Sequence, residues 1–208
     1  MPASSRTPTE SRLFPVHTLA SAPERSKAAL AQLASSFGMV PNLVGAIANA
    51  PVLIESLVGL FGKVHGGSFS EAEVQVVLLT DAVTNRSAWP VAFHTTLALK
   101  EGVPPEDVEA IRDGQLPKDG RFRAVSGLAR SLIDKRGHLD RSDVDAFLAA
   151  GFERAQLLEL VAAVAASTIT NYAASITQPS LDEPFAAHAW HPDDAHGPAR
   201  LQVAQEGA

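Results

Sequence analysis

Residues 70–102 have the sequence SEAEVQVVLLTDAVTNRSAWPVAFHTTLALKEG and carry most of the information about the fold. The stretch begins with a capping-box pattern, Ser70-Glu-Ala-Glu, and continues as an almost wholly apolar helix. A helix that is apolar nearly all round belongs at the centre of a protein. Residues 85–87, Asn-Arg-Ser, predict a break, after which Pro90 suits the first turn of a second helix that ends before Gly102.

The rest of the chain repeats this helical pattern. Apolar residues recur at spacings of three and four, and glycine or proline separates the segments. Alanine, the strongest helix former and a poor strand residue, occurs 35 times among the 208 residues, and no run alternates as a strand would. We therefore predict an all-α fold of about eight helices with short connections.

Composition divides the chain into three parts. Residues 1–20 are rich in Ser, Thr and Pro, and predict a flexible leader without the apolar centre of a signal peptide. Residues 21–182 hold the helical segments and predict a single domain, and residues 183–208 predict a polar tail. Residues 69–89 and 152–172 align at a shift of 83, a weak echo that indicates an internal duplication.

Charge and composition also exclude classes of function. The formal net charge is −6, so we expect no nucleic-acid partner. The most apolar run, residues 157–166, is short and interrupted by Glu159, so we expect no membrane span and a cytoplasmic location. There is no cysteine, which excludes disulfides, thiolate metal sites and a cysteine nucleophile.

Residues 85–102, from Asn-Arg-Ser-Ala-Trp-Pro to the final Gly, resemble the signature of the carboxymuconolactone decarboxylase and alkylhydroperoxidase-D superfamily. Residues 37–51 (FGMVPNLVGAIANAP), 145–172 (DAFLAAGFERAQLLELVAAVAASTITNY), 179–185 (PSLDEPF) and Trp190 resemble its longer, peroxidase-related members. The resemblance implies an antiparallel helical bundle of the alkylhydroperoxidase-D type that associates as a homo-oligomer.

The same resemblance implies that the peroxidase centre is missing. That branch reduces peroxide with a Cys-x-x-Cys pair, assisted by a glutamate on the preceding helix and by a histidine. Here the cysteine positions hold Ser87 and Pro90, the glutamate position holds Gln75, and only His94 remains. Neither an alcohol nor a proline forms the sulfenate and disulfide states that peroxide reduction needs, so thiol peroxidase activity is not expected.

The decarboxylase branch suggests another role for His94. Its members also lack the cysteine pair, and they share a histidine followed by the counterparts of Ala98 and Gly102. A histidine with a pKa near neutrality can transfer a proton while charge develops on a dienolate. Two hypotheses stay open. One is a cofactor-free proton-transfer enzyme of the decarboxylase or isomerase type acting on a small, fairly apolar substrate. The other is an inactive relative serving as a binding or assembly module.

Gln75 and Ser87 are further candidates for the catalytic site. Gln75 can orient a ligand by hydrogen bonding. Ser87 is a nucleophile if His94 is its base, but two helical turns, about 10 Å along the axis, separate the two residues, which favours a helix cap instead.

Four neighbouring residues are candidates for substrate binding. Trp89 and Phe93 either stack on a substrate or fill the core. Asn85 and Arg86 precede them, and Arg86 either holds a carboxylate or forms a solvated helix end.

The C-terminal residues offer one more alternative, a metal site. The set comprises His188, His191 and His196 with Asp193 and Asp194. The spacing of these residues lacks the regularity of helical metal ligands, so we predict no metal and no cofactor.

Overall fold

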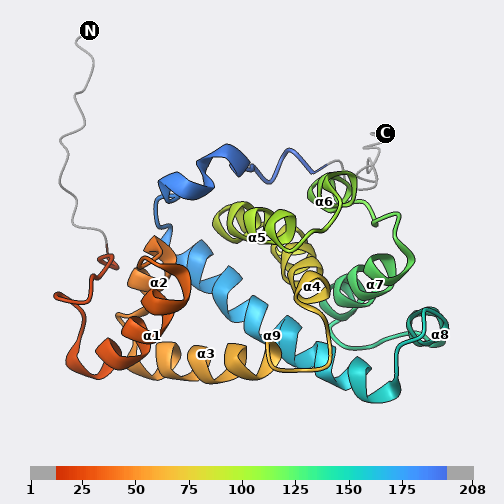
Figure 1. The fold of residues 1–208 in the computed structure, drawn as a ribbon, viewed down its shortest axis with the longest axis horizontal. Coiled ribbons are helices and arrows are strands. Elements are labelled where there is room, and N and C mark those ends of the chain that lie inside the picture. Colours follow the sequence, from red (N-terminus) through yellow and green to blue (C-terminus); the bar gives the residue numbers. More distant parts are fainter. Residues whose placement is uncertain (1–12, 196–208) are drawn as a thin grey trace, which may run out of the picture.

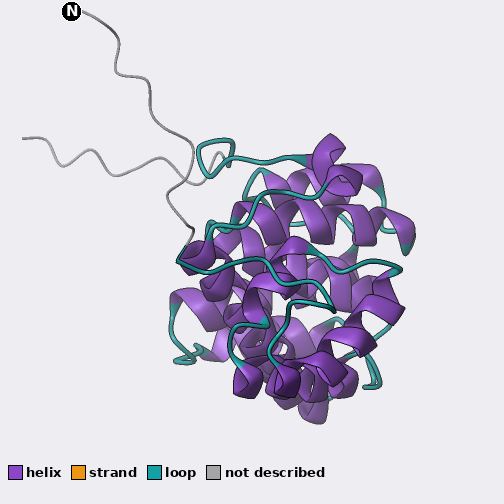
Figure 2. Ribbon diagram, turned by 90° about the vertical axis from the view of Figure 1, so that its left-hand side faces the viewer, coloured by secondary structure: helices purple, strands orange, loops and turns teal. Residues whose placement is uncertain are grey.

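The computed structural model describes residues 13–195 and is all-helical over that range (Figure 1). Figure 2 shows only helices and loops there. The elements are η1 (Glu24–Ser26), α1 (Lys27–Phe37), α2 (Asn42–Ile47), α3 (Pro51–Val64), α4 (Glu71–Thr84), α5 (Ala88–Lys100), α6 (Pro105–Arg112), α7 (Gly120–Asp134), α8 (Arg141–Ala149), α9 (Arg154–Thr177) and η2 (Glu183–His188). The predicted all-α class is confirmed, with nine α-helices and two short 3₁₀ helices in the described range. Residues 1–12 and 196–208, parts of the predicted leader and tail, lie outside it.

Helix α4 forms the centre of the fold, as its apolar sequence predicted. Every residue from Glu73 to Val83 is buried, and the helix packs against α5, α7 and α9 (Figure 1). The capping box at its start is complete. The Ser70 hydroxyl accepts a hydrogen bond from the Glu73 N–H at 3.2 Å, and the Glu73 carboxylate accepts one from the Ser70 N–H at 2.9 Å. These bonds fix the start of α4 and hence the position of Gln75.

A three-residue turn, Asn85–Ser87, reverses the chain between α4 and α5. Arg86 adopts a left-handed backbone conformation with φ of 55°, and its N–H bonds to the carbonyl of Val83 at 2.9 Å. As predicted, Pro90 lies in the first turn of α5, and the helix ends before Gly102, whose φ is 82°. The turn folds α5 back against α4.

Two hydrophobic cores share α9, which runs through the whole fold (Figure 1). One core is formed mainly by buried residues of α4, α6, α7 and α8, together with the N-terminal half of α9. The other joins α1, α2 and α3 to the aromatic residues of α5 and to the C-terminal half of α9. The candidate site lies beside this second core.

Both ends of the described chain pack on the helices. His17, in the predicted leader, donates its backbone N–H to α2 at 3.0 Å. At the other end, residues 183–188 form η2, which packs on α5, and Phe185 and Trp190 are buried. The packed part of the chain therefore reaches beyond the predicted limits of 21–182.

Helix α9 is long and apolar enough to cross a membrane, by length and composition only, with a mean hydropathy of 1.4. This differs from the expectation that no stretch would qualify. Core helices can have the same length and composition, but only 33% of this apolar window is buried. The expected absence of a membrane partner stays a prediction.

The internal duplication also stays a prediction. The aligned residues Phe69 and Phe152 do contact each other, with ring centroids 5.7 Å apart. Helix α4 ends at Thr84, however, whereas α9 continues without a break to Thr177.

Candidate functional site

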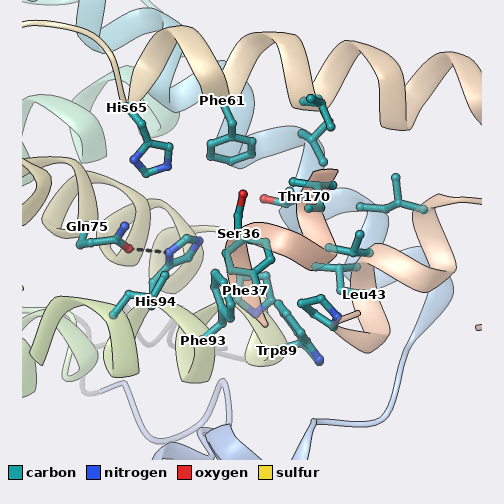
Figure 3. A pocket seen from close by; sticks show the side chains of 18 of the residues that line it. Ser36, Phe37, Leu43, Phe61, His65, Gln75, Trp89, Phe93, His94 and Thr170 are labelled. Carbon is teal, nitrogen blue, oxygen red and sulfur yellow. Dashed lines mark hydrogen bonds between the residues drawn. The ribbon is translucent and has the colours of Figure 1, made fainter. Parts of the chain in front are cut away.

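A cavity of about 530 Å³ lies between helices α1 to α3 on one side and α4, α5 and α9 on the other. Its volume falls in the range of about 300–1,000 Å³ that is usual for small-molecule sites. Figure 3 shows imidazole and amide side chains at one end and mostly apolar side chains along the rest, with the hydroxyl residues Ser36 and Thr170 among them. The polar end holds His65, Gln75 and His94, and the apolar part holds Phe37, Leu43, Phe61, Trp89 and Phe93.

His94 of α5 and Gln75 of α4 meet at the polar end. The His94 Nδ1 atom and the Gln75 Oε1 atom are 3.0 Å apart, and both side chains are buried. Because a carboxamide oxygen only accepts hydrogen bonds, this pairing assigns the proton of the ring to Nδ1 and leaves Nε2 unprotonated. Figure 3 shows the far side of the His94 ring turned toward the cavity. Nε2 is therefore a hydrogen-bond and proton acceptor for a bound molecule.

Burial and, as the smaller cause, the nearby charge of His65 together lower the pKa of His94 from its ordinary value of 6.5 to about 3. His94 is thus neutral at pH 7. This corrects the expectation of a histidine that titrates near neutrality. Such a residue can accept a proton from a ligand but carries no extra proton to give away at the outset.

Aromatic rings form the wall beside His94. The rings of Trp89 and Phe93 stack with centroids 5.2 Å apart, and Phe185 of η2 meets Phe93 edge to face at 5.0 Å. The indole N–H of Trp89 donates to Asp182 Oδ2 at 3.1 Å, which fixes the ring. Trp89 and Phe93 pack in the second core, as one predicted alternative required, and they also line the cavity. Stacking on a substrate stays a prediction.

Three predicted site residues lie elsewhere. Asn85 bonds to a backbone carbonyl of α4 at 2.9 Å, and Arg86 forms an exposed ion pair with Asp193 at 3.4 Å. Ser87 is buried at the start of α5, where its hydroxyl donates to the Asn171 carbonyl at 3.2 Å and makes no capping bond. The cavity lining given by the described residues contains none of the three.

Two ionisable residues at the cavity were missed from the sequence, His65 after α3 and Glu71 at the start of α4. Their Nδ1 and Oε2 atoms are 2.8 Å apart, and both residues line the cavity. In the sequence they appear only as a helix break and as part of a capping box. An inspection of the ionisable residues in the break before the central helix would have found them.

The described part of the chain contains no group of three or more His, Cys, Asp or Glu residues placed to hold a metal ion. His191 and Asp193 approach to 3.8 Å, both well exposed, whereas His196 lies outside the described residues. The predicted lack of a metal or cofactor remains a prediction.

No protein-family model and no curated protein matches the chain. Solved structures do. One is the alkylhydroperoxidase AhpD core of an uncharacterized peroxidase-related protein from Ralstonia eutropha JMP134, with a TM-score of 0.73 and 17% identity over 83% of this chain and 93% of that one. Another is the debrominase Bmp8, with a TM-score of 0.71 and 14% identity over 89% and 98% of the two chains.

The same debrominase, as a cysteine-to-alanine variant, is also similar when solved in complex with 2,3,4-tribromopyrrole, with a TM-score of 0.69 and 15% identity over 86% of this chain and 96% of that one. Identities this low establish the fold alone. The protein therefore has the helical fold of the alkylhydroperoxidase AhpD core, built from a sequence without cysteine.

Proposed function

We propose that this protein is a cofactor-free enzyme that moves a proton on a small, mostly apolar molecule bound beside His94. One observation carries the proposal: a neutral, buried His94 faces a ligand-sized cavity while Gln75 fixes its tautomer. The cytoplasmic location and homo-oligomeric state expected from the sequence belong to the same proposal.

The lining supports a particular kind of substrate. Aromatic and aliphatic walls favour a flat, apolar body, and the free Nε2 atom of His94 favours an acidic C–H, O–H or N–H group at the polar end. The debrominase of similar fold was solved with 2,3,4-tribromopyrrole, a small ring that bears an N–H. That ligand supports the proposed size and class of substrate.

The protonation state of His94 favours isomerisation over decarboxylation. In isomerisation a C–H bond next to a carbonyl breaks, its proton moves to Nε2, and its electron pair forms the enolate. The same proton then returns to another carbon of the conjugated system. Decarboxylation requires the residue to supply a proton to the carbon that loses carbon dioxide, and a neutral His94 starts without one.

The low pKa of His94 is compatible with this step. Burial penalises an isolated imidazolium because water no longer solvates the charge. An enolate formed in the same step lies next to the imidazolium, and the attraction between the two charges beside the buried His94 offsets much of that penalty. His94 becomes an effective base only when the substrate that it deprotonates is present.

Thiol peroxidase chemistry is excluded from the proposal. The chain has no cysteine to attack a peroxide, and Ser87, at the first cysteine position, directs its hydroxyl to a backbone carbonyl. The second candidate function is a binding module without catalysis. The observation that favours it is the same low pKa of His94, since a weakly basic histidine can accept a hydrogen bond without removing a proton.

Turnover of 5-nitrobenzisoxazole separates these two functions. The probe is flat and apolar, and a base alone opens its ring to a coloured cyanophenolate. We expect saturable turnover about 10²–10⁴-fold faster than with equimolar free imidazole, in the range of general base catalysis. The variant His94→Gln should abolish turnover, whereas His138→Asn, which alters an exposed histidine, should retain it.

Saturable binding of the probe without turnover would support the binding module and overturn the enzyme. Turnover that survives His94→Gln would place the base elsewhere. Circular dichroism spectra of the three proteins establish that the variants are folded.

A further inference from the structure

We propose that His65, held by Glu71, is a second acid–base residue of the cavity and works across the bound molecule from His94. The inference rests on the proposed function and deepens it. It assigns to the site substrates that lose a proton at one atom and gain a proton at another, typically an oxygen.

The geometry presents His65 to the cavity in one orientation. Glu71 Oε2 accepts a hydrogen bond from the Nδ1–H of His65 at 2.8 Å, which leaves Nε2 of the ring for a ligand. The ring of Phe61 stacks on the imidazole with centroids 5.9 Å apart and an interplanar angle of 25°. Figure 3 shows His65 directed from α3 toward the end of the cavity that holds Gln75 and His94.

The two imidazoles have opposite partners. His94 is buried against an uncharged amide, whereas His65 is partly exposed and bonded to a carboxylate. A carboxylate stabilises positive charge on an imidazole and an amide does so far less. Two titratable groups in contrasting environments beside one cavity can act as a base and an acid, here His94 as the base and His65 as the acid. Lys100 and Glu101 also line this region, at the end of α5.

Solvent access completes the pair. The side chains of His65 and Glu71 keep 37% and 45% of their exposure, so His65 can exchange protons with water while a ligand fills the cavity. The buried His94 has no comparable access. His65 can therefore regain a proton from water between turnovers, and it is the residue through which protons enter the site.

The ring opening of a benzisoxazole contains both steps. The C–H bond breaks and its proton moves to Nε2 of His94, while the electron pair forms the C≡N bond and the N–O bond breaks. The released oxygen takes a proton from His65 in its imidazolium form, which water then reprotonates, and His94 loses its proton to water that enters the cavity once the product has left. Only a poor leaving oxygen needs that donation during bond breaking.

Leaving-group dependence tests this role. Rates are measured with the 5-nitro, 5-chloro and unsubstituted benzisoxazoles, in order of worsening leaving group. In His65→Asn we expect a loss below about threefold with the nitro compound and above about tenfold with the unsubstituted one. His94→Gln should abolish turnover of all three, and the exposed-residue control His138→Asn should change none.

Glu71 is a positioning residue, and its test is the same leaving-group dependence. Glu71→Gln should lower the rate with the unsubstituted compound more than the rate with the nitro compound, because His65 loses the partner that orients its ring. A purely structural role for Glu71 would lower both rates by the same factor.

The outcomes separate this inference from the proposed function. Equal losses with all three compounds in His65→Asn, or no loss, overturn the role of His65 while the base role of His94 stands. If the wild-type protein turns over none of the compounds, the proposed function fails and this inference fails with it. Binding of the inert azole 6-nitrobenzotriazole to each variant shows that the cavity has kept its shape.

Discussion

The Nδ1 atom of His94 lies 3.0 Å from the Oε1 atom of Gln75, and both side chains are buried. Within the described residues, neither side chain forms a hydrogen bond to a charged group. The resemblance to the peroxidase branch places a glutamate where Gln75 stands. An amide orients the ring as a carboxylate would but does not stabilise the imidazolium. Burial therefore dominates, and the pKa of His94 falls to about 3.

The first prediction concerns stability. Folding lowers the pKa of His94 from its ordinary value of 6.5 to about 3, so between these two pH values the folded protein binds fewer protons than the unfolded chain. The contribution of neutral His94 to the free energy of unfolding is therefore complete above about pH 6.5 and decreases toward pH 3. Over this range the unfolding equilibrium constant increases by up to about tenfold for each pH unit of acidification. Urea unfolding between about pH 4.5 and pH 7 should show a shallower dependence in His94→Gln than in the wild type or in His138→Asn. Identical slopes in all three proteins would contradict it.

The second prediction concerns Gln75→Glu. A carboxylate beside Nδ1 stabilises the imidazolium, so His94 should titrate at higher pH and become a stronger base. Turnover of 5-nitrobenzisoxazole should rise about tenfold at neutral pH, followed by absorbance. Gln75→Leu, which removes the hydrogen bond without adding charge, should instead lower the rate. A rate that falls equally in both variants would show that Gln75 acts only through packing.

The third prediction concerns Asp81, a fully buried carboxyl group on α4. Burial raises the pKa of Asp81 well above its ordinary value of 3.8, and among the described residues neither carboxyl oxygen has a hydrogen-bond partner. The folded protein therefore retains this proton more strongly than the unfolded chain, and stability falls as the pH rises above about 4. Asp81→Asn should remove this loss.

Thermal unfolding measures the Asp81 effect. We expect Asp81→Asn to raise the melting temperature at pH 8 by about 2–4 °C per kcal/mol gained and to change it little near pH 4. The exposed-residue variant Asp113→Asn provides the matched control. A destabilisation at pH 8 would show that the ionised Asp81 makes a favourable interaction in the core.

The fourth prediction tests the sequence alignment. Ser87 occupies the N-cap position of α5 and Pro90 its first turn, so the two positions match the Cys-x-x-Cys arrangement at a helix start. The double variant Ser87→Cys with Pro90→Cys should form an intramolecular disulfide in air, detected as two thiols that appear only after reduction. Thiols that stay free under oxidising conditions would show that the positions do not correspond to the cysteine pair.

Local sequence rules predicted the part of the site that α4 and α5 build. A capping box fixes where α4 begins, and the Asn-Arg-Ser break with Pro90 fixes where α5 begins. Those limits place Gln75 and His94 at matching levels on adjacent helices. The spacing of four between Trp89 and Phe93 then brings both rings to the same wall.

The remaining features depend on tertiary packing. His65 and Glu71 flank the break between α3 and α4, but that they line the cavity depends on how α1 to α3 pack opposite α4 and α5. Arg86 lies away from the cavity because its left-handed backbone directs it toward the C-terminal segment, where Asp193 meets it. The pKa of His94 depends on the side chains that exclude water from it, and these come from elements far apart in the sequence.

The most direct test of the central claim is the protonation state of His94 with an acidic ligand bound. Nitrogen NMR of histidine-labelled protein at pH 7 should show neutral His94 with its proton on Nδ1 when the cavity is free. Saturation with 6-nitrobenzotriazole, which has an acidic N–H, should convert His94 to imidazolium beside the azole anion. A His94 that stays neutral while the azole occupies the cavity would contradict its role as the proton acceptor.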